Sequence, residues 1–299
     1  MSNKEMNSLT GTHRGYTMIA NRFLPPLLVL VLLLITVLLP GCLVNDKKSS
    51  KTIPRTTDRL RPIIGNEYFQ YNITGQRNYI SGGSTQPVTG TLTVKYSKIN
   101  LLLPSGTDTI SAIQEDSTIT VNGTTQSIVR LLQQDAAIGT LSVIAINFGG
   151  TIYYVGQNDQ WDSPLDVVFL PSPIPLTGNN TVDFQYFSGC PPTCTATVAT
   201  LTEDVTFKGN ADIQTNVGKF NAIKIDFSGS TKLASPIISN GPFDFRGACS
   251  ATNTDYSGAS YIFPEVGVVF VDYTCTSSDS TIDTLQIKLT STNVAIPKQ

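Results

Sequence analysis

Four cysteines in the second half of the chain have a type and spacing that could do chemistry: Cys190, Cys194, Cys249 and Cys275. Such thiols can form disulfides, bind zinc or exchange electrons. Four-thiolate zinc sites usually contain paired C-x2-C motifs and redox sites contain one, whereas this chain has neither. In an exported protein, an even number of cysteines indicates disulfides. We expect Cys190–Cys194 to close locally and Cys249–Cys275 to be the second pair, while the other pairings stay open.

Histidine and carboxylate side chains are the next candidates for catalysis. The single histidine and the lack of a carboxylate pair with a favourable spacing argue against an enzyme. The single histidine, His13, lies in an N-terminal segment that we expect to be removed. Its loss excludes Ser-His-Asp and Cys-His catalysis and His-ligated zinc. A glycosidase needs a carboxylate pair. No spacing favours such a pair among the aspartates or the later glutamates, which are Glu67, Glu115, Glu203 and Glu265. We expect no enzymatic activity, no cofactor and no metal.

The removable segment is indicated by an apolar run over residues 23–39, which follows Arg14 and Arg22. A basic stretch before a short apolar run is typical of a secretory signal, and the run is shorter than the roughly 20 residues of a membrane span. It ends at Leu39-Pro40-Gly41-Cys42. This ending resembles the lipobox of bacterial lipoproteins. The alternative is a single transmembrane anchor.

The lipobox resemblance implies a signal peptide over residues 1–41 and an acylated Cys42 as the first mature residue. A mature protein of this kind is held at the cell envelope by its lipid chains. In that family, Asp after the cysteine favours the inner membrane, so Leu43 implies the outer membrane, on its periplasmic or its surface side. Met18 is a candidate for the true start, because residues 18–22 form an ordinary basic n-region.

Residues 42–62 are rich in lysine and arginine, contain Pro54 and Pro62, and have no strand or helix periodicity. We expect them to form a flexible tether between the lipid and the folded part of the chain. The alternative is a basic stretch that contacts anionic head groups.

The elements that must position any site are strands. Apolar and polar residues alternate at 91–96, 182–186, 223–227 and 285–289, which predicts half-buried strands of an antiparallel sheet. Asn122-Gly123 predicts a tight hairpin turn. We therefore expect residues 63–299 to form a single all-β domain, with an antiparallel curved sheet that is barrel-like or a half-barrel.

Two segments depart from simple alternation. Residues 140–148 are apolar almost throughout, which predicts a central strand buried on both faces. Residues 126–137 are the one moderate helix candidate, because Ile128, Leu131 and Leu132 lie about one turn apart; another strand is the alternative.

Two motifs in the last third carry a further resemblance. Residues 215–225 have the pattern T-x-x-G-x-F-x-A-x-K-I, and residues 261–269 have the pattern Y-x-x-P-x-V-G-x-V. Together they are similar to a group of uncharacterised exported bacterial β-sheet proteins, many of them lipoproteins. The resemblance implies a curved antiparallel sheet, broadly like the half-barrels that carry lipoproteins or lipids across the periplasm. It carries over no catalytic residue.

Composition narrows the function classes further. Charged residues make up 14% of the chain and the formal net charge is -2, so we expect no nucleic-acid partner. We expect a non-enzymatic lipoprotein whose β domain binds a hydrophobic ligand or an envelope protein. The alternatives are a structural or surface-exposed lipoprotein without a ligand pocket and, with less support, a carboxylate hydrolase. An apolar cavity of roughly 300 Å³ or more would favour ligand binding, and a filled core would favour a structural role.

Overall fold

The computed structural model describes residues 51–135, 137, 139–148, 150–157, 160–161, 168–190, 194, 196–233, 254–277 and 280–297. The predicted signal peptide, Cys42 and the first part of the predicted tether lie outside these residues. Within them every helix or strand is a β-strand, and no helix is long and apolar enough to cross a membrane. The strands are β1 (Thr52–Ile53), β2 (Tyr68–Tyr79), β3 (Ser84–Leu102), β4 (Thr109–Val121), β5 (Thr124–Gln134), β6 (Leu141–Phe148), β7 (Thr151–Gln157), β8 (Gln160–Trp161), β9 (Val168–Leu170), β10 (Thr177–Ser188), β11 (Ala196–Gln214), β12 (Lys219–Leu233), β13 (Thr254–Phe263), β14 (Gly267–Ser277) and β15 (Thr281–Thr292).

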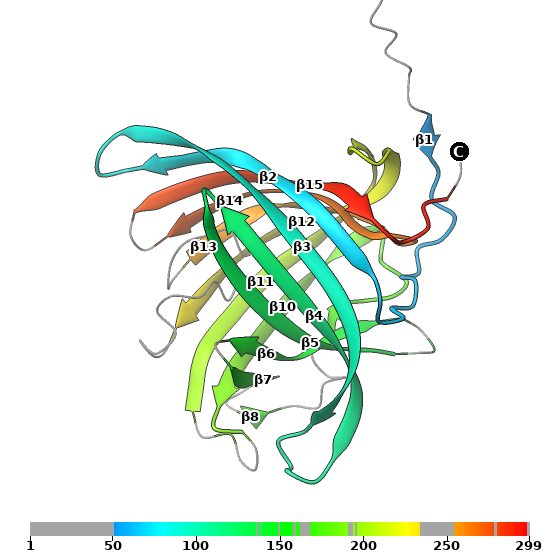
Figure 1. Ribbon diagram of the computed structural model, residues 1–299, viewed down its shortest axis with the longest axis vertical. Helices are drawn as coiled ribbons and strands as arrows, with labels where there is room; N and C mark the ends of the chain where they lie inside the picture. Colours follow the sequence, from blue (N-terminus) through cyan, green and yellow to red (C-terminus); the bar gives the residue numbers. More distant parts are fainter. Residues whose placement is uncertain are drawn as a thin grey trace, which may run out of the picture. The chain divides into compact units, whose positions relative to one another are not determined.

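Twelve strands close into an antiparallel barrel. Their order is β7-β10-β11-β12-β13-β14-β15-β2-β3-β4-β5-β6, and β6 pairs back with β7 to complete the ring. Figure 1 shows these long, curved strands lying side by side around the barrel. The prediction of an all-β, barrel-like fold is confirmed, and the sheet closes fully where the family resemblance implied a half-barrel.

Alternating side chains give the barrel an apolar interior. On β2, Phe69, Tyr71 and Ile73 are buried, whereas Asn72 between them is exposed. In the register of the sheet, Tyr71 lies opposite Leu289 of β15 and Leu92 of β3, and both of these are buried too. Because successive residues of a strand point to opposite faces, the two-residue periodicity of the sequence is what places the core inside the ring.

Some glycines lie inside strands where neighbouring backbones come very close. A Cβ atom added at Gly258 on β13 would lie 2.2 Å from the carbonyl oxygen of Asp272 and 2.6 Å from the Cα of Tyr273. A Cβ at Gly90 on β3 would lie 2.0 Å from the carbonyl oxygen of Thr120. Glycine in a strand often marks such a close approach, so these residues permit the tight pairing of β13 with β14 and of β3 with β4.

The helix candidate at 126–137 is wrong, and the alternative strand is present as β5. Asn122 and Gly123 have φ angles of 47° and 84°, so the predicted hairpin turn forms and returns the chain along β4. β5 then lies between β4 and β6. The spacing of Ile128, Leu131 and Leu132 suited a helix, but hydrogen-bonded pairing with a strand on each side determines the conformation.

The prediction of a two-sided strand at 140–148 is confirmed by β6. Its residues from Leu141 to Ile146 are all buried. Val143 belongs to one apolar cluster and Ile144 to another, which also contains Tyr154 of β7. Apolar residues on both faces of β6 are therefore covered.

The predicted tether is wrong for residues 52–62, because this part of the chain packs on the barrel. β1 pairs in parallel with the start of β12, where Ile53 lies opposite Phe220, and Ile53 is only 3% exposed. Gly218 makes room for it, since a Cβ there would lie 2.9 Å from the Ile53 Cδ1 atom. Burial of Ile53 among aromatic and aliphatic side chains explains why this basic, proline-containing segment is ordered against the sheet.

Both motifs of the last third form hairpins. In the first, the Thr215 amide donates a hydrogen bond to the Gly218 carbonyl oxygen between β11 and β12. In the second, the Val266 amide donates to the Phe263 carbonyl oxygen between β13 and β14. These hairpins place β11 to β14 side by side in the barrel wall (Figure 1).

Candidate functional site: a cavity inside the barrel

The barrel contains a cavity of about 200 Å³. Most of its lining is apolar. Val182 and Val205 line it from β10 and β11; both are half-buried, and each also packs against an apolar cluster of the core. Further apolar lining comes from Leu92, Val94, Phe207, Ile225, Phe227, Ile262, Val271 and Ile287. The core is thus not filled, although the cavity is smaller than the roughly 300 Å³ typical of drug-sized pockets.

Four side chains form a polar cluster in the wall of this cavity: Tyr96, Glu115, Ser117 and Arg130. Arg130 donates from Nε to Glu115 Oε1 at 2.8 Å and from Nη2 to Glu115 Oε2 at 2.7 Å. The Tyr96 hydroxyl donates to Glu115 Oε2 at 2.9 Å, and the Ser117 hydroxyl donates to Glu115 Oε1 at 3.2 Å. Glu115 is 2% exposed, so its charge is held by these donors and not by bulk water.

The register of three strands brings the polar cluster together. Glu115 of β4 lies directly opposite Tyr96 of β3 on one side and Arg130 of β5 on the other. Residues directly opposite in a sheet are close enough for their side chains to interact. Burial raises the pKa of the Tyr96 phenol well above its usual value, and the nearby Glu115 charge adds to the rise. The phenol therefore keeps its proton and remains a donor to Glu115.

Part of the cavity wall comes from residues 56–67, which we call the strap. Leu60, Arg61 and Ile63 of the strap line the cavity. The Leu60 amide donates to Ser172 Oγ at 3.1 Å, and the Ile174 amide donates to the Asp58 carbonyl oxygen at 2.8 Å. These two bonds join the strap to the segment that follows β9.

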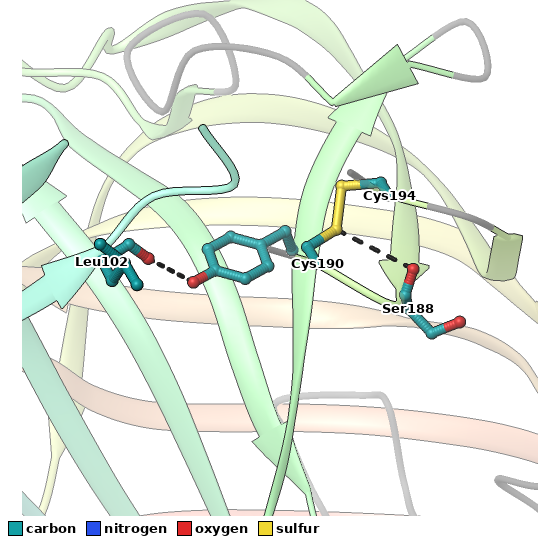
Figure 2. Close-up of a disulfide and its surroundings, with 5 residues drawn as sticks. Leu102, Ser188, Cys190 and Cys194 are labelled. Carbon is teal, nitrogen blue, oxygen red and sulfur yellow. Dashed lines mark hydrogen bonds between the residues drawn. A yellow bond between two sulfur atoms is a disulfide. The ribbon is translucent and has the colours of Figure 1, made fainter. Parts of the chain in front are cut away.

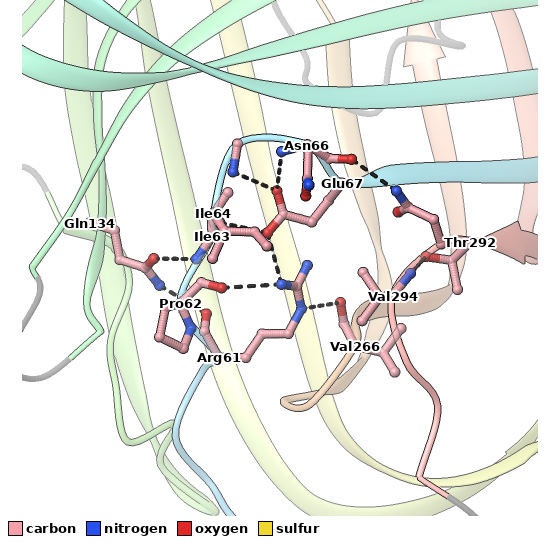
Figure 3. A network of polar contacts seen from close by, with 12 residues as sticks. Arg61, Pro62, Ile63, Ile64, Asn66, Glu67, Gln134, Val266, Thr292 and Val294 are labelled. Carbon is pink, nitrogen blue, oxygen red and sulfur yellow. Dashed lines mark hydrogen bonds and ion pairs between the residues drawn. The ribbon is translucent and has the colours of Figure 1, made fainter.

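Gln134, the last residue of β5, holds the middle of the strap. Its Oε1 accepts from the Ile63 amide at 2.8 Å, and its Nε2 donates to the Arg61 carbonyl oxygen at 3.1 Å (Figure 3). At the start of the strap, Thr56 donates from both its amide and its hydroxyl to Glu265 Oε1, at 2.7 Å each. The strap is therefore fixed by residues far away in the sequence.

The Glu67 carboxylate accepts hydrogen bonds from four other residues of the strap (Figure 3). Its Oε1 accepts from the Ile64 amide at 2.7 Å and from Arg61 Nη1 at 2.9 Å, and its Oε2 accepts from the Gly65 amide at 2.8 Å and the Asn66 amide at 3.0 Å. Burial raises the pKa of the Glu67 carboxyl, but the Ile64 amide and Arg61 outweigh burial, so this pKa lies below its ordinary value.

Replacing Glu67 with glutamine should lower the free energy of unfolding near neutral pH by about 1–3 kcal/mol. A carboxyl whose pKa is lower in the folded state stabilises the fold above its ordinary pKa of 4.5 and loses this effect as pH falls through the folded value. The difference between wild type and Glu67→Gln should therefore shrink below that pH. Denaturant unfolding across the acid range checks this, with Asp108→Asn on an exposed turn as control. A difference that stays constant with pH would contradict it.

The predicted disulfide Cys190–Cys194 is present, with its sulfur atoms 1.98 Å apart (Figure 2). Cys190 packs against the apolar cluster that contains Tyr154, whose hydroxyl donates to the Leu102 carbonyl oxygen. Neither cysteine lines the cavity.

The other predicted cysteine sites are less completely described. Cys275 on β14 is buried and disulfide-bonded. Cys249 lies outside the described residues, so its pairing with Cys275 stays a prediction, as does the acylation of Cys42. Among the residues that the structure describes, no three His, Cys, Asp or Glu side chains are grouped as a metal site requires.

The sequence analysis singled out neither Glu115 nor Glu203 from the four later glutamates. The structure places both of them in the lining of the cavity. One signal could have identified Glu115. It occupies an inward position of a strand whose neighbouring inward positions include the buried Ile113 and Ile119. Arg130 likewise falls between the buried Ile128 and Leu132. A charged residue at an apolar position of the repeat indicates a buried partner, although its identity depends on strand register.

No protein-family model and no curated protein matches the sequence. Among solved structures, the fold is similar to a proposed exported protein with a YmcC-like fold from Bacteroides fragilis, with a TM-score of 0.36 and 10% identity over 79% of this chain and 99% of that chain. It is also similar to a proposed lipoprotein from Parabacteroides distasonis, with a TM-score of 0.28 and 10% identity over the same shares of the two chains. Both similarities are distant, so the description of this fold depends on the strand pairing of the chain itself.

Proposed function

We propose that this chain is a non-enzymatic, lipid-anchored protein of the bacterial cell envelope whose barrel binds a hydrophobic or amphiphilic ligand. The observation that supports ligand binding is the cavity inside the barrel, with largely apolar walls and a buried polar cluster. Binding sites for small molecules commonly combine an apolar lining with a few placed polar groups. The cavity volume of about 200 Å³ suits a short chain or a small part of a lipid.

A non-enzymatic role is supported by the chemistry of the side chains. The chain beyond the signal contains no histidine. In the cavity, Glu115 is engaged by Arg130 through charge-assisted hydrogen bonds, which suits a structural carboxylate better than a general base.

The proposed anchor is supported by the sequence Leu39-Pro40-Gly41-Cys42, and the proposed outer-membrane location by Leu43. Replacing Cys42 with serine should abolish acylation, because only the thiol accepts the lipid in bacterial lipoproteins. The precursor should then stay unprocessed or be released from the membrane fraction. Labelling cells with a radioactive fatty acid measures this directly. Label that persists in Cys42→Ser would contradict the lipobox, and Cys190→Ser is a control that should keep the label.

Ligand binding is tested by filling the cavity from one wall. Val205 lines the cavity, whereas the next residue, Thr206, points to the other face of β11. The full chain, purified in lipid nanodiscs, should carry or take up an apolar molecule that native mass spectrometry detects against empty nanodiscs. Val205→Trp should reduce this occupancy by about tenfold or more, equivalent to 1.4 kcal/mol, and Thr206→Trp should not.

The outcomes separate the candidate functions. If wild type neither carries nor takes up an apolar molecule, ligand binding is wrong and a structural lipoprotein is the better description. If Val205→Trp folds and binds as wild type does, the ligand lies elsewhere on the chain.

A further inference from the structure

The polar cluster offers hydrogen-bond acceptors to the cavity. Tyr96 and Ser117 both line it, and each gives its hydroxyl proton to Glu115. A hydroxyl group has one proton but two lone pairs. With their protons committed, the two hydroxyl oxygens retain only accepting capacity toward anything in the cavity.

The positive charges that the described residues bring to the lining are already neutralised. Among these residues two arginines line the cavity, and each is ion-paired: Arg130 with Glu115 at 2.5 Å and Arg61 with Glu67 at 2.9 Å. Glu203 adds a further carboxylate to the lining. An anionic head group placed against Tyr96 and Ser117 would meet hydroxyl lone pairs beside the Glu115 carboxylate, in a largely apolar space where an uncompensated charge is costly.

We propose that the ligand of this cavity is an amphiphile with an uncharged head group that donates a hydrogen bond, a hydroxyl or an amide N–H, and that a free carboxylic acid is excluded. The inference depends on the proposed function. The head group donates to the Tyr96 and Ser117 oxygens, and the apolar chain lies along Val94, Val182 and Val205. An ammonium head would also donate, but its charge would have to leave water for an apolar cavity.

Four probes with the same alkyl chain test this inference: octan-1-ol, octyl methyl ether, octanoate and octylamine. Calorimetric titration of the full chain in lipid nanodiscs, with empty nanodiscs as blank, gives their dissociation constants. The alcohol should bind about five- to tenfold more tightly than the ether, which cannot donate, because one or two neutral hydrogen bonds have that effect. Octanoate and octylamine should bind more weakly than the alcohol.

Variants of the polar cluster connect the preference to its residues. Tyr96→Phe removes one acceptor, so the alcohol should lose about fivefold in affinity while the ether is unaffected. Tyr68→Phe on the outer face of β2 is the matched control and should change neither value. Ser117→Ala provides a second, smaller change if Tyr96→Phe folds poorly.

The failure of this inference is distinguishable from failure of the proposed function. If none of the four probes binds, the proposed function is wrong. If the ether binds as well as the alcohol, or if octanoate or octylamine binds more tightly, ligand binding stands and the proposed head group is wrong. A Tyr96→Phe variant that keeps the full preference for the alcohol over the ether also overturns the inference.

Discussion

Replacing Glu115 with alanine should destabilise the barrel by about 3–5 kcal/mol, because it removes the carboxylate that neutralises the buried Arg130. Arg130 has a side-chain exposure of 13%, and two of its guanidinium nitrogens donate to Glu115. Loss of Glu115 also removes the acceptor of the Tyr96 and Ser117 hydroxyls. Denaturant unfolding of the wild type and the variant measures the change.

A double variant separates the missing partner from the missing volume. Glu115→Ala combined with Arg130→Met should be less destabilised than Glu115→Ala alone, since no charge is then left without a partner in the cavity wall. Lys208→Met is the surface control. Lys208 lies 3.8 Å from Asp226 and is 48% exposed, and such exposed pairs contribute little. A loss in Glu115→Ala no larger than in this control would show that the polar cluster is not a buried ion pair.

The second large loss of stability is expected when a single methyl group is added at Gly258. Gly258→Ala should lower the free energy of unfolding by about 3 kcal/mol, at the upper end of overpacking costs. The added Cβ would lie 2.2 Å from the Asp272 carbonyl oxygen and 2.5 Å from the Tyr273 Cβ. Backbone atoms of β14 cannot rotate away as a flexible side chain can, so β13 and β14 would have to separate locally.

A matched glycine provides the control for this variant. Gly82 lies in the turn between β2 and β3, where the nearest atom to an added Cβ is Ser84 Oγ at 4.0 Å. Gly82→Ala should be neutral or slightly stabilising, because alanine restricts the unfolded chain. Thermal unfolding of both variants is the measurement. Equal melting temperatures for Gly258→Ala and Gly82→Ala would rule out the close approach of the two strands.

The strands were predictable from the sequence, because the alternation of apolar and polar residues involves only neighbouring residues. The repeat at 285–289 needs only neighbouring residues to indicate one buried face, and Asn122-Gly123 indicates its turn in two residues. The closed barrel was not distinguishable from a half-barrel, since closure depends on pairing between β6 and β7 and between β15 and β2. The helix candidate failed because the apolar spacing at residues 128–132 also suits a helix, whereas the pairing of β5 with both β4 and β6 fixes it as a strand.

The site was less predictable than the fold. Glu115 breaks an apolar repeat and could be singled out, but its pairing with Arg130 follows from the register of β4 against β5. Residues 52–62 were assigned to a tether because single apolar residues such as Ile53 and Leu60 set no periodicity. Their contacts are with Phe220 and with Ser172, more than a hundred residues away.

The pairing of β15 with β2 joins the last strand of the barrel, in sequence order, to one of its first. β2 begins at Tyr68 and its partner ends at Thr292, so the ring cannot close until β15 has been synthesised. Contacts between such distant residues are associated with slow folding. A chain that stopped before β15 would leave the edges of β2 and β14 unpaired, and open edges of this kind favour aggregation.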